Sequence, residues 1–120
     1  MVPSFLDKTY AMLDDESLSD IISWSELGTE FIIKNPLEFW ATVLPRFFKH
    51  QNMASFVRQL NMYDFHKSRN DTYEHVFQHP LFLREKPHLL KDITRKTPEY
   101  QLLDDRFEKQ ESAFFLQKIT

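Results

Sequence analysis

Residues 53–62, MASFVRQLNM, constrain the fold more than any other stretch, because their apolar side chains recur with helical spacing. The apolar positions i, i+3, i+4 and i+7 are Met53, Phe56, Val57 and Leu60. The opposite face carries Ser55, Arg58, Gln59 and Met62. The pattern predicts an amphipathic helix with Arg58 as its only charged side chain. A surface helix usually carries several Lys and Glu residues, so this polar face needs an explanation.

The residues before this helix predict another helix, two strands and a third helix. Pro3 lies near the start of the first helix, whose apolar positions are Phe5, Leu6, Tyr10 and Leu13. The strands are expected in DIISWS and TEFIIK, joined by a turn that contains the only glycine. Asn35, Pro36 and Glu38 form a near-complete capping box for the next helix. Its predicted core face is Leu37, Trp40, Val43 and Leu44, with Pro45 bending or breaking it.

After a short turn, Asn52 is the expected N-cap of the helix over 53–62. Residues 65–79 predict two strands joined by the polar turn SRNDT. A last helix opens at Pro87 and turns Leu89, Leu90 and Ile93 inward. This order predicts an α+β winged helix-turn-helix fold, a three-helix bundle with a small antiparallel β-sheet. We expect one domain over residues 1–97, followed over 98–120 by a helical tail or the start of an oligomerisation coiled coil.

Composition excludes several classes of protein. The chain has no Cys, which excludes a disulfide scaffold and any thiolate metal or redox site. No apolar run approaches the length of a membrane span, and the first residues do not resemble a secretory signal. Twelve Phe residues predict an aromatic core. We therefore expect a nuclear or cytosolic protein with no membrane partner.

Charge is segregated along the chain although the formal net charge is −3. Residues 44–69 contain five basic side chains and one acidic side chain, Asp64, whereas residues 14–38 contain seven acidic and one basic. The basic part includes the helix over 53–62, with Lys49 and Lys67 on either side of it. Because local potential steers an anionic partner more than net charge does, this distribution favours a nucleic acid.

A recognition helix explains the polar face of residues 53–62. The major groove of DNA admits one helix, and the planar guanidinium of an Arg matches the O6 and N7 atoms of guanine. Short polar neighbours let the helix come close, and flanking cations at Lys49 and Lys67 would fix its register through phosphate contacts. The alternative is an ordinary amphipathic helix with a mixed, solvated surface, and amphipathicity alone does not separate the two.

Three segments resemble the DNA-binding domain of heat shock transcription factors. The first segment is VPSFLDKTYAML and the third is FQHPLFLREKPHLLKDITRK. The second starts with ISWSELGTEFIIKNPLEFW and runs on through FKHQNMASFVRQLNMY. The resemblance runs from about Val2 to Thr97. It implies a winged helix-turn-helix that binds double-stranded DNA at inverted nGAAn repeats, in a nuclear transcription regulator of the stress response.

The resemblance also implies roles for single residues. Arg58 would read the guanine, and Ser55 and Asn61 would contact a base or the backbone. The implied phosphate contacts are Lys49, His50, Tyr63 and Lys67. The wing would lie toward neighbouring protomers rather than in the DNA.

The chain departs from the family pattern next to the recognition helix. Asp64 stands where the family usually has Gly, and His66 stands where it usually has Arg. A residue just past a helix end often needs a left-handed conformation, which Asp tolerates better than most non-Gly residues. The negative charge of Asp64 is unfavourable near a helix C-terminus and near phosphate. The wing over 68–75 is also short, which weakens the case for contacts between protomers.

No other constellation predicts chemistry. His75 and His79 fall in a strand-like stretch, where residues four apart lie too far apart to share one tetrahedral ion. No nucleophile elbow or Gly-rich phosphate loop occurs, so neither an enzyme nor a cofactor is expected. Along the tail, Gln110 and Gln117 interrupt the apolar seam of Leu103, Phe107 and Phe114. We therefore expect this chain to be mainly monomeric. The tail from Pro98 lies where the heat shock factor family begins its trimerising coiled coil, so the resemblance implies a homotrimer in a longer chain.

Two other functions remain open. The same domain is expected in related regulators that bind a different DNA element. A winged helix used only for protein contacts would show no affinity for DNA, and its basic face would be covered by a protein.

Overall fold

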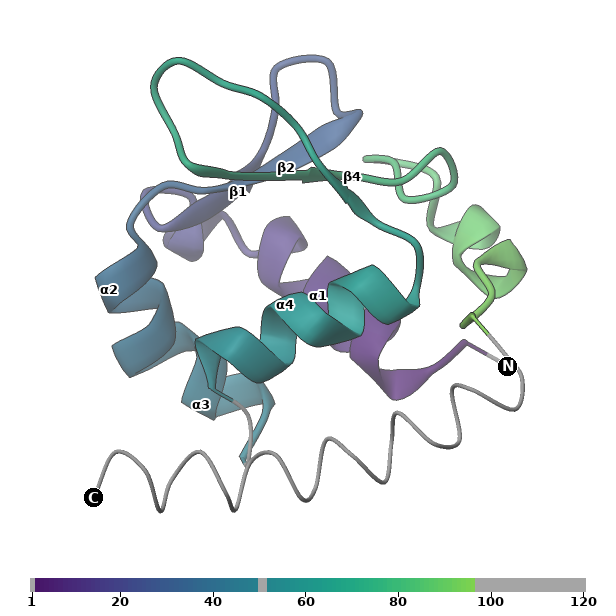
Figure 1. The fold of residues 1–120 in the computed structure, drawn as a ribbon, viewed down its shortest axis with the longest axis horizontal. Helices are drawn as coiled ribbons and strands as arrows, with labels where there is room; N and C mark the ends of the chain where they lie inside the picture. Colours follow the sequence, from purple (N-terminus) through teal and green to yellow (C-terminus); the bar gives the residue numbers. More distant parts are fainter. Residues whose placement is uncertain (1, 50–51, 97–120) are drawn as a thin grey trace.

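The computed structural model describes residues 2–49 and 52–96 (Figure 1). The order of elements is α1 (Ser4–Asp14), η1 (Glu16–Leu18), β1 (Ile22–Trp24), β2 (Glu30–Ile33), α2 (Pro36–Glu38), η2 (Phe39–Val43), α3 (Leu44–Phe47), α4 (Met53–Met62), β3 (His66–Lys67), β4 (His75–Gln78) and η3 (Pro87–Asp92). The predicted order of helices and strands is confirmed. The predicted tail over 98–120 lies outside the described residues.

The strands form one antiparallel sheet of four strands in the order β1-β2-β4-β3. Ile22 pairs with Ile33 between β1 and β2, and Phe31 pairs with Phe77 between β2 and β4. Lys67 pairs with Phe77, which places β3 at the edge of the sheet. In Figure 1 the sheet lies over α1 and α4, so the described chain has the predicted α+β winged-helix plan.

The core between the helices and the sheet is aromatic, as the twelve Phe residues predicted. Phe56 of α4 is 0% exposed, and its ring lies 5.5 Å from that of Phe5 and 5.3 Å from that of Phe39. On the sheet side, Phe31 lies 5.6 Å from Phe77 and 5.8 Å from Phe82. Tilted and edge-on ring pairs at these separations add to the free energy gained by burying the rings.

Both predicted N-caps are confirmed. The Asn35 side chain accepts a hydrogen bond from the backbone N–H of Glu38 at 3.1 Å and donates to the Glu38 carboxylate at 3.3 Å. The Asn52 side chain accepts from the backbone N–H of Ser55 at 2.8 Å. Each cap satisfies a donor that a helix start would otherwise leave unpaired.

The predicted core face of the helix over 36–47 is wrong at two positions. Leu37 is 74% exposed and Trp40 is 50% exposed, whereas Phe39, Val43 and Leu44 are buried. Residues Phe39–Val43 form a π-helical turn, in which the N–H of Leu44 bonds to the carbonyl of Phe39. This wider turn rotates Val43 and Leu44 away from the face that Trp40 occupies. The helix does not break at Pro45 and continues to Phe47.

Trp24, unlike Trp40, packs against the core. It is half-buried, with its ring 5.3 Å from Tyr10 and 5.2 Å from Phe82. The last predicted helix is the 3₁₀ helix η3, in which Leu90 is buried and Leu89 is half-buried.

The turn between β1 and β2 requires its glycine. Gly28 has a φ of 74°, which L side chains rarely adopt. The Arg84 backbone N–H donates to the Gly28 carbonyl at 3.0 Å, and its guanidinium donates to the Glu26 carbonyl at 3.1 Å. A Cβ atom on Gly28 would lie 2.9 Å from the Arg84 Cβ. Arg84 therefore fastens the segment after β4 to this turn.

Candidate nucleic-acid interface

Helix α4 presents its polar side outward because its apolar side is anchored in the core. Phe56 and Leu60 are both 0% exposed, which fixes the rotation of the helix about its axis. Asn61 is exposed, and Ser55, Arg58 and Gln59 are half-buried. The predicted bounds 53–62 and the inward face are confirmed. Arg58 is therefore partly packed, with its Nε atom buried, and helical spacing puts the residue on the side of α4 opposite the anchors.

Two predicted phosphate ligands lie at the two ends of α4. Lys49 is exposed in the turn that precedes the helix, and Lys67 is exposed on β3, which follows it. Within the described residues, Arg46 is also exposed at the end of α3 and its guanidinium lies over the ring of Phe47. His50 lies outside the described residues. Lys49 and Lys67 thus lie on different segments, one before α4 and one after it.

Tyr63 has a structural role beside the one expected for it. It is 7% exposed, and its ring stacks on that of Phe5 with centroids 5.6 Å apart and an angle of 5° between planes. This contact joins the end of α4 to α1. Only a small part of Tyr63 is left for contact with a phosphate.

Met62 corrects the prediction for the outward face. It is 8% exposed rather than open to solvent. The guanidinium of Arg95 contacts the Met62 sulfur at 3.4 Å, and the backbone N–H of Lys96 donates to the Met62 carbonyl at 2.8 Å. The segment after η3 therefore covers the last turn of α4, a contact between residues that are far apart in sequence.

The end of α4 is a Schellman motif built around Asp64. The N–H of Phe65 bonds to the carbonyl of Leu60 at 2.9 Å, and the N–H of Asp64 bonds to that of Asn61 at 3.1 Å. Asp64 has a φ of 67°, so the left-handed conformation expected at this position is confirmed. The buried side chains of Leu60 and Phe65 supply the apolar pair that usually accompanies this motif.

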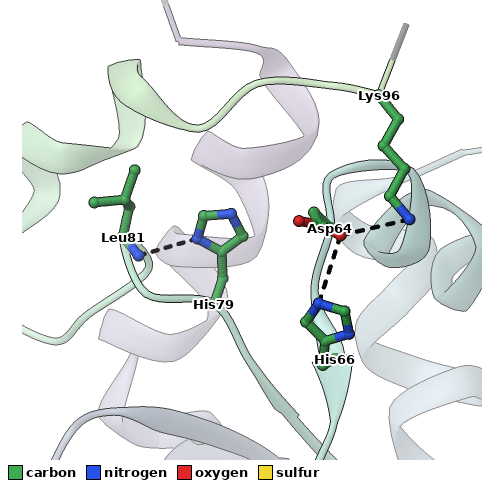
Figure 2. A network of polar contacts seen from close by, with 5 residues as sticks. All are labelled: Asp64, His66, His79, Leu81 and Lys96. Atoms are coloured by element: carbon green, nitrogen blue, oxygen red, sulfur yellow. Dashed lines mark hydrogen bonds and ion pairs between the residues drawn. The ribbon is translucent and has the colours of Figure 1, made fainter.

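The Asp64 carboxylate lies between two cationic or ionisable groups (Figure 2). Its Oδ1 atom is 3.4 Å from the Nζ of Lys96 and 3.5 Å from the Nε2 of His66. Asp64 and Lys96 are each about half exposed. No local sequence pattern predicts this pair, because Asp64 and Lys96 are far apart in the sequence and only the fold brings them together.

His79 lies beside this cluster and is held as a neutral imidazole. Its Nδ1 atom accepts a hydrogen bond from the Leu81 N–H at 3.0 Å (Figure 2), and its ring lies 5.2 Å from that of Phe65. Burial lowers the pKa of His79, and the neighbouring His66 lowers it further, whereas the charge of Asp64 opposes the shift. Only the unprotonated Nδ1 can accept the Leu81 bond.

We expect the protein to lose stability as the pH falls from 7.5 to 5.5, partly through His79. A folded-state pKa below the ordinary value of about 6.5 means that the unfolded chain binds the proton first. The contribution of His79 to the free energy of unfolding is therefore complete above about pH 6.5 and is lost below it. Denaturant unfolding at pH 7.5 and 5.5 should show that His79→Gln loses less free energy of unfolding between the two pH values than the wild type does. His88→Gln removes an exposed histidine and should keep the wild-type loss; equal losses in all three proteins would contradict the assignment.

The described residues contain no group of three or more His, Asp or Glu side chains placed to hold a metal ion. His75 lies in β4 and His79 follows that strand. Over the same ranges, no helix is long and apolar enough to cross a membrane.

Comparison with known families identifies the family to which the chain belongs. The family model described as HSF-type DNA-binding matches residues 5–96, which include all but the first residue of α1, the sheet, α4 and Lys96. The chain belongs to this family. The family is one of DNA-binding transcription factors rather than of enzymes.

Curated relatives carry the same assignment. Heat stress transcription factor A-4c of Arabidopsis thaliana is 48% identical over 97 residues, which are 81% of this chain and 28% of the relative. Heat shock factor protein 4 of Mus musculus is 39% identical over 127 residues, covering 98% of this chain and 26% of the relative. The chain thus spans about a quarter of the length of these relatives.

Solved structures confirm the fold. Skn7 of Chaetomium thermophilum, crystallised with SSRE DNA, matches with a TM-score of 0.73 and 43% identity, covering 78% of this chain and all of that one. A heat shock transcription factor bound to DNA matches with a TM-score of 0.58 and 43% identity over 64% of this chain and 94% of that one. The HSF-type domain is therefore a winged helix-turn-helix here as in these structures.

Proposed function

We propose that this chain is the sequence-specific, double-stranded DNA-binding module of a heat-shock-factor-like transcription regulator, with α4 in the major groove. One observation carries the proposal: α4 is anchored by Phe56 and Leu60 and turns a face with Arg58 as its only charge outward, between exposed Lys49 and Lys67. The similar structures were solved with DNA, which supports the same use of this face.

Each residue has a part in the proposal. Arg58 reads a guanine through its planar fork, and Ser55 and Asn61 contact a base or the backbone on either side of it. Lys49, His50 and Lys67 bind phosphate and fix the register, with a smaller contribution from the exposed edge of Tyr63. Short side chains around Arg58 let the helix backbone approach the base edges.

The DNA element proposed is an inverted repeat of nGAAn, and the cellular site is the nucleus. Repeats imply several modules on one DNA, and linking modules raises the effective concentration of each. A homotrimer is proposed only for a longer chain, through the segment from residue 98. A second candidate is the same domain on another element, since the Skn7 domain was crystallised with both SSRE DNA and HSE DNA.

Selection from random duplexes tests the proposal. The wild-type chain should enrich GAA units in inverted order, and the same protein should show little affinity for a scrambled duplex at moderate salt. Enrichment of a different element would establish the second candidate. Absence of any DNA affinity would contradict both and leave α4 as a surface for protein contacts.

Lys49→Ala and Lys67→Ala are each expected to weaken a cognate and a scrambled duplex by about the same factor. Both side chains are exposed and would contact phosphate, which carries no sequence information. Each substitution should lower the slope of log affinity against log salt by roughly one. Titration at several salt concentrations measures both effects. Lys91→Ala, which removes an exposed cation on η3, is the control and should change neither; loss on the cognate duplex alone would show that the lysines read sequence.

A further inference from the structure

Asp64 is the only acidic side chain among residues 44–69, and it lies directly after the proposed recognition helix. Its carboxylate is 3.4 Å from the Lys96 ammonium group. Both side chains are about half exposed, so a phosphate approaching the end of α4 would reach the same ammonium group. A carboxylate and a phosphate oxygen are alternative acceptors for one cation.

We propose that Asp64 is an affinity-setting residue: its carboxylate competes with the DNA backbone for Lys96 and so weakens binding to every duplex. The inference rests on the proposed function, because it places phosphate near the C-terminal end of α4. The proposal concerns the affinity for DNA rather than the preference for a DNA sequence, since neither Asp64 nor Lys96 lies on the outward face that carries Arg58.

Backbone contacts hold Lys96 close to the end of α4. The Lys96 N–H donates to the Met62 carbonyl at 2.8 Å, so the Lys96 side chain starts from the last turn of α4 in every state that keeps this bond. The Arg95 guanidinium contacts the Met62 sulfur at 3.4 Å and fastens the same segment. Lys96 can therefore exchange Asp64 for phosphate by a side-chain rotation, without moving the helix.

The turn itself does not require the charge of Asp64. The left-handed φ of 67° is adopted by Asn as readily as by Asp, and by Gly more readily still. A carboxylate at a helix C-terminus is opposed by the helix dipole. The geometry of the Schellman motif is thus available to neutral residues. Within residues 2–49 and 52–96, the carboxylate adds its ion pairs with Lys96 and His66 and its effect on the pKa of His79.

Asp64→Asn tests the effect with the backbone preserved. At pH 8, where histidine side chains are largely neutral, the variant should bind cognate and scrambled duplexes about two- to fivefold more tightly, the range of one exposed ion pair. The salt slope should steepen by about one as Lys96 gains a phosphate. Glu85→Asn is a matched control, because Glu85 is an exposed acidic residue with a φ of 66° in the segment between β4 and η3. It should leave both quantities unchanged.

A double-mutant cycle separates competition from simple repulsion. Lys96→Gln should weaken DNA binding more in the Asp64→Asn background than in the wild type, because only there is Lys96 fully available to phosphate. Additive effects, or an Asp64→Asn affinity no higher than the wild type, would overturn the proposal. Thermal unfolding checks that each variant is folded. If the wild type binds no duplex, the proposed function fails; if the wild type binds and the cycle is additive, only the role of Asp64 fails.

Discussion

Phe56→Ala is expected to lower the free energy of unfolding by about 3–5 kcal/mol, the cost of removing a fully buried aromatic ring from a packed core. Phe56 is 0% exposed, and its ring lies 5.5 Å from Phe5, 5.3 Å from Phe39 and 6.1 Å from Phe48. These rings come from α1, from the π-helical turn and from the turn before α4. The cavity would thus loosen three segments that hold the recognition helix.

Phe47→Ala is the matched control for this substitution. Phe47 is also a phenylalanine next to the helix-turn-helix turn, but it is only half-buried, with Arg46 over its ring. Its removal should cost about half as much or less, since less apolar surface returns to water. Denaturant unfolding of both variants at pH 7.5 measures the difference. Equal losses would show that the ring cluster around Phe56 does not hold α4 in place.

The sequence predicted the elements whose signals are local. Asn52 as N-cap and the apolar spacing of Phe56 and Leu60 were enough to place α4 at 53–62. The capping box at Asn35 and the turn at Gly28 placed the preceding helix start and hairpin in the same way. Each of these features is decided by side chains within a few residues of one another, so propensity and packing agree there.

The errors lie where distant residues or an irregular turn decide burial. Trp40 is exposed because the π-helical turn breaks the regular spacing on which its assignment rested. Met62 is buried because Arg95 and Lys96 cover it. Neither effect has a signal in a window of ten residues. The Asp64–Lys96 pair belongs with them, since only the fold brings a residue after η3 to the end of α4.

In the candidate site, too, some residues were predicted from local patterns, whereas other contacts appear only in the fold. Arg58 and the flanking lysines were found from charge and helical spacing, and the structure places them on and around α4. Tyr63 was assigned by resemblance to a phosphate contact, and the structure shows that its ring also stacks on Phe5. A substitution at Tyr63 would therefore change folding and binding together. Arg58 is the better test of recognition.

Arg58→Ala is expected to cost about 1–3 kcal/mol of binding free energy on a GAA site and to remove most of the preference for guanine. The substitution leaves Phe56 and Leu60 in place, so the fold should be kept. Arg58→Lys restores the charge without the two-pronged donor geometry, and affinity should return in part while discrimination does not. Gln59→Ala, the adjacent half-buried residue, is the control and should keep the guanine preference.

Binding of all four proteins to the cognate duplex and to one with the guanine replaced separates the roles of charge and geometry. A base reader loses affinity mainly on the cognate duplex, so the two affinities should converge in Arg58→Ala. A phosphate contact loses affinity equally on both, as expected for Lys49 and Lys67. If Arg58→Ala kept the wild-type preference for the guanine duplex, Arg58 would not be the reader, and specificity would have to come from Ser55, from Asn61 or from the shape of the DNA.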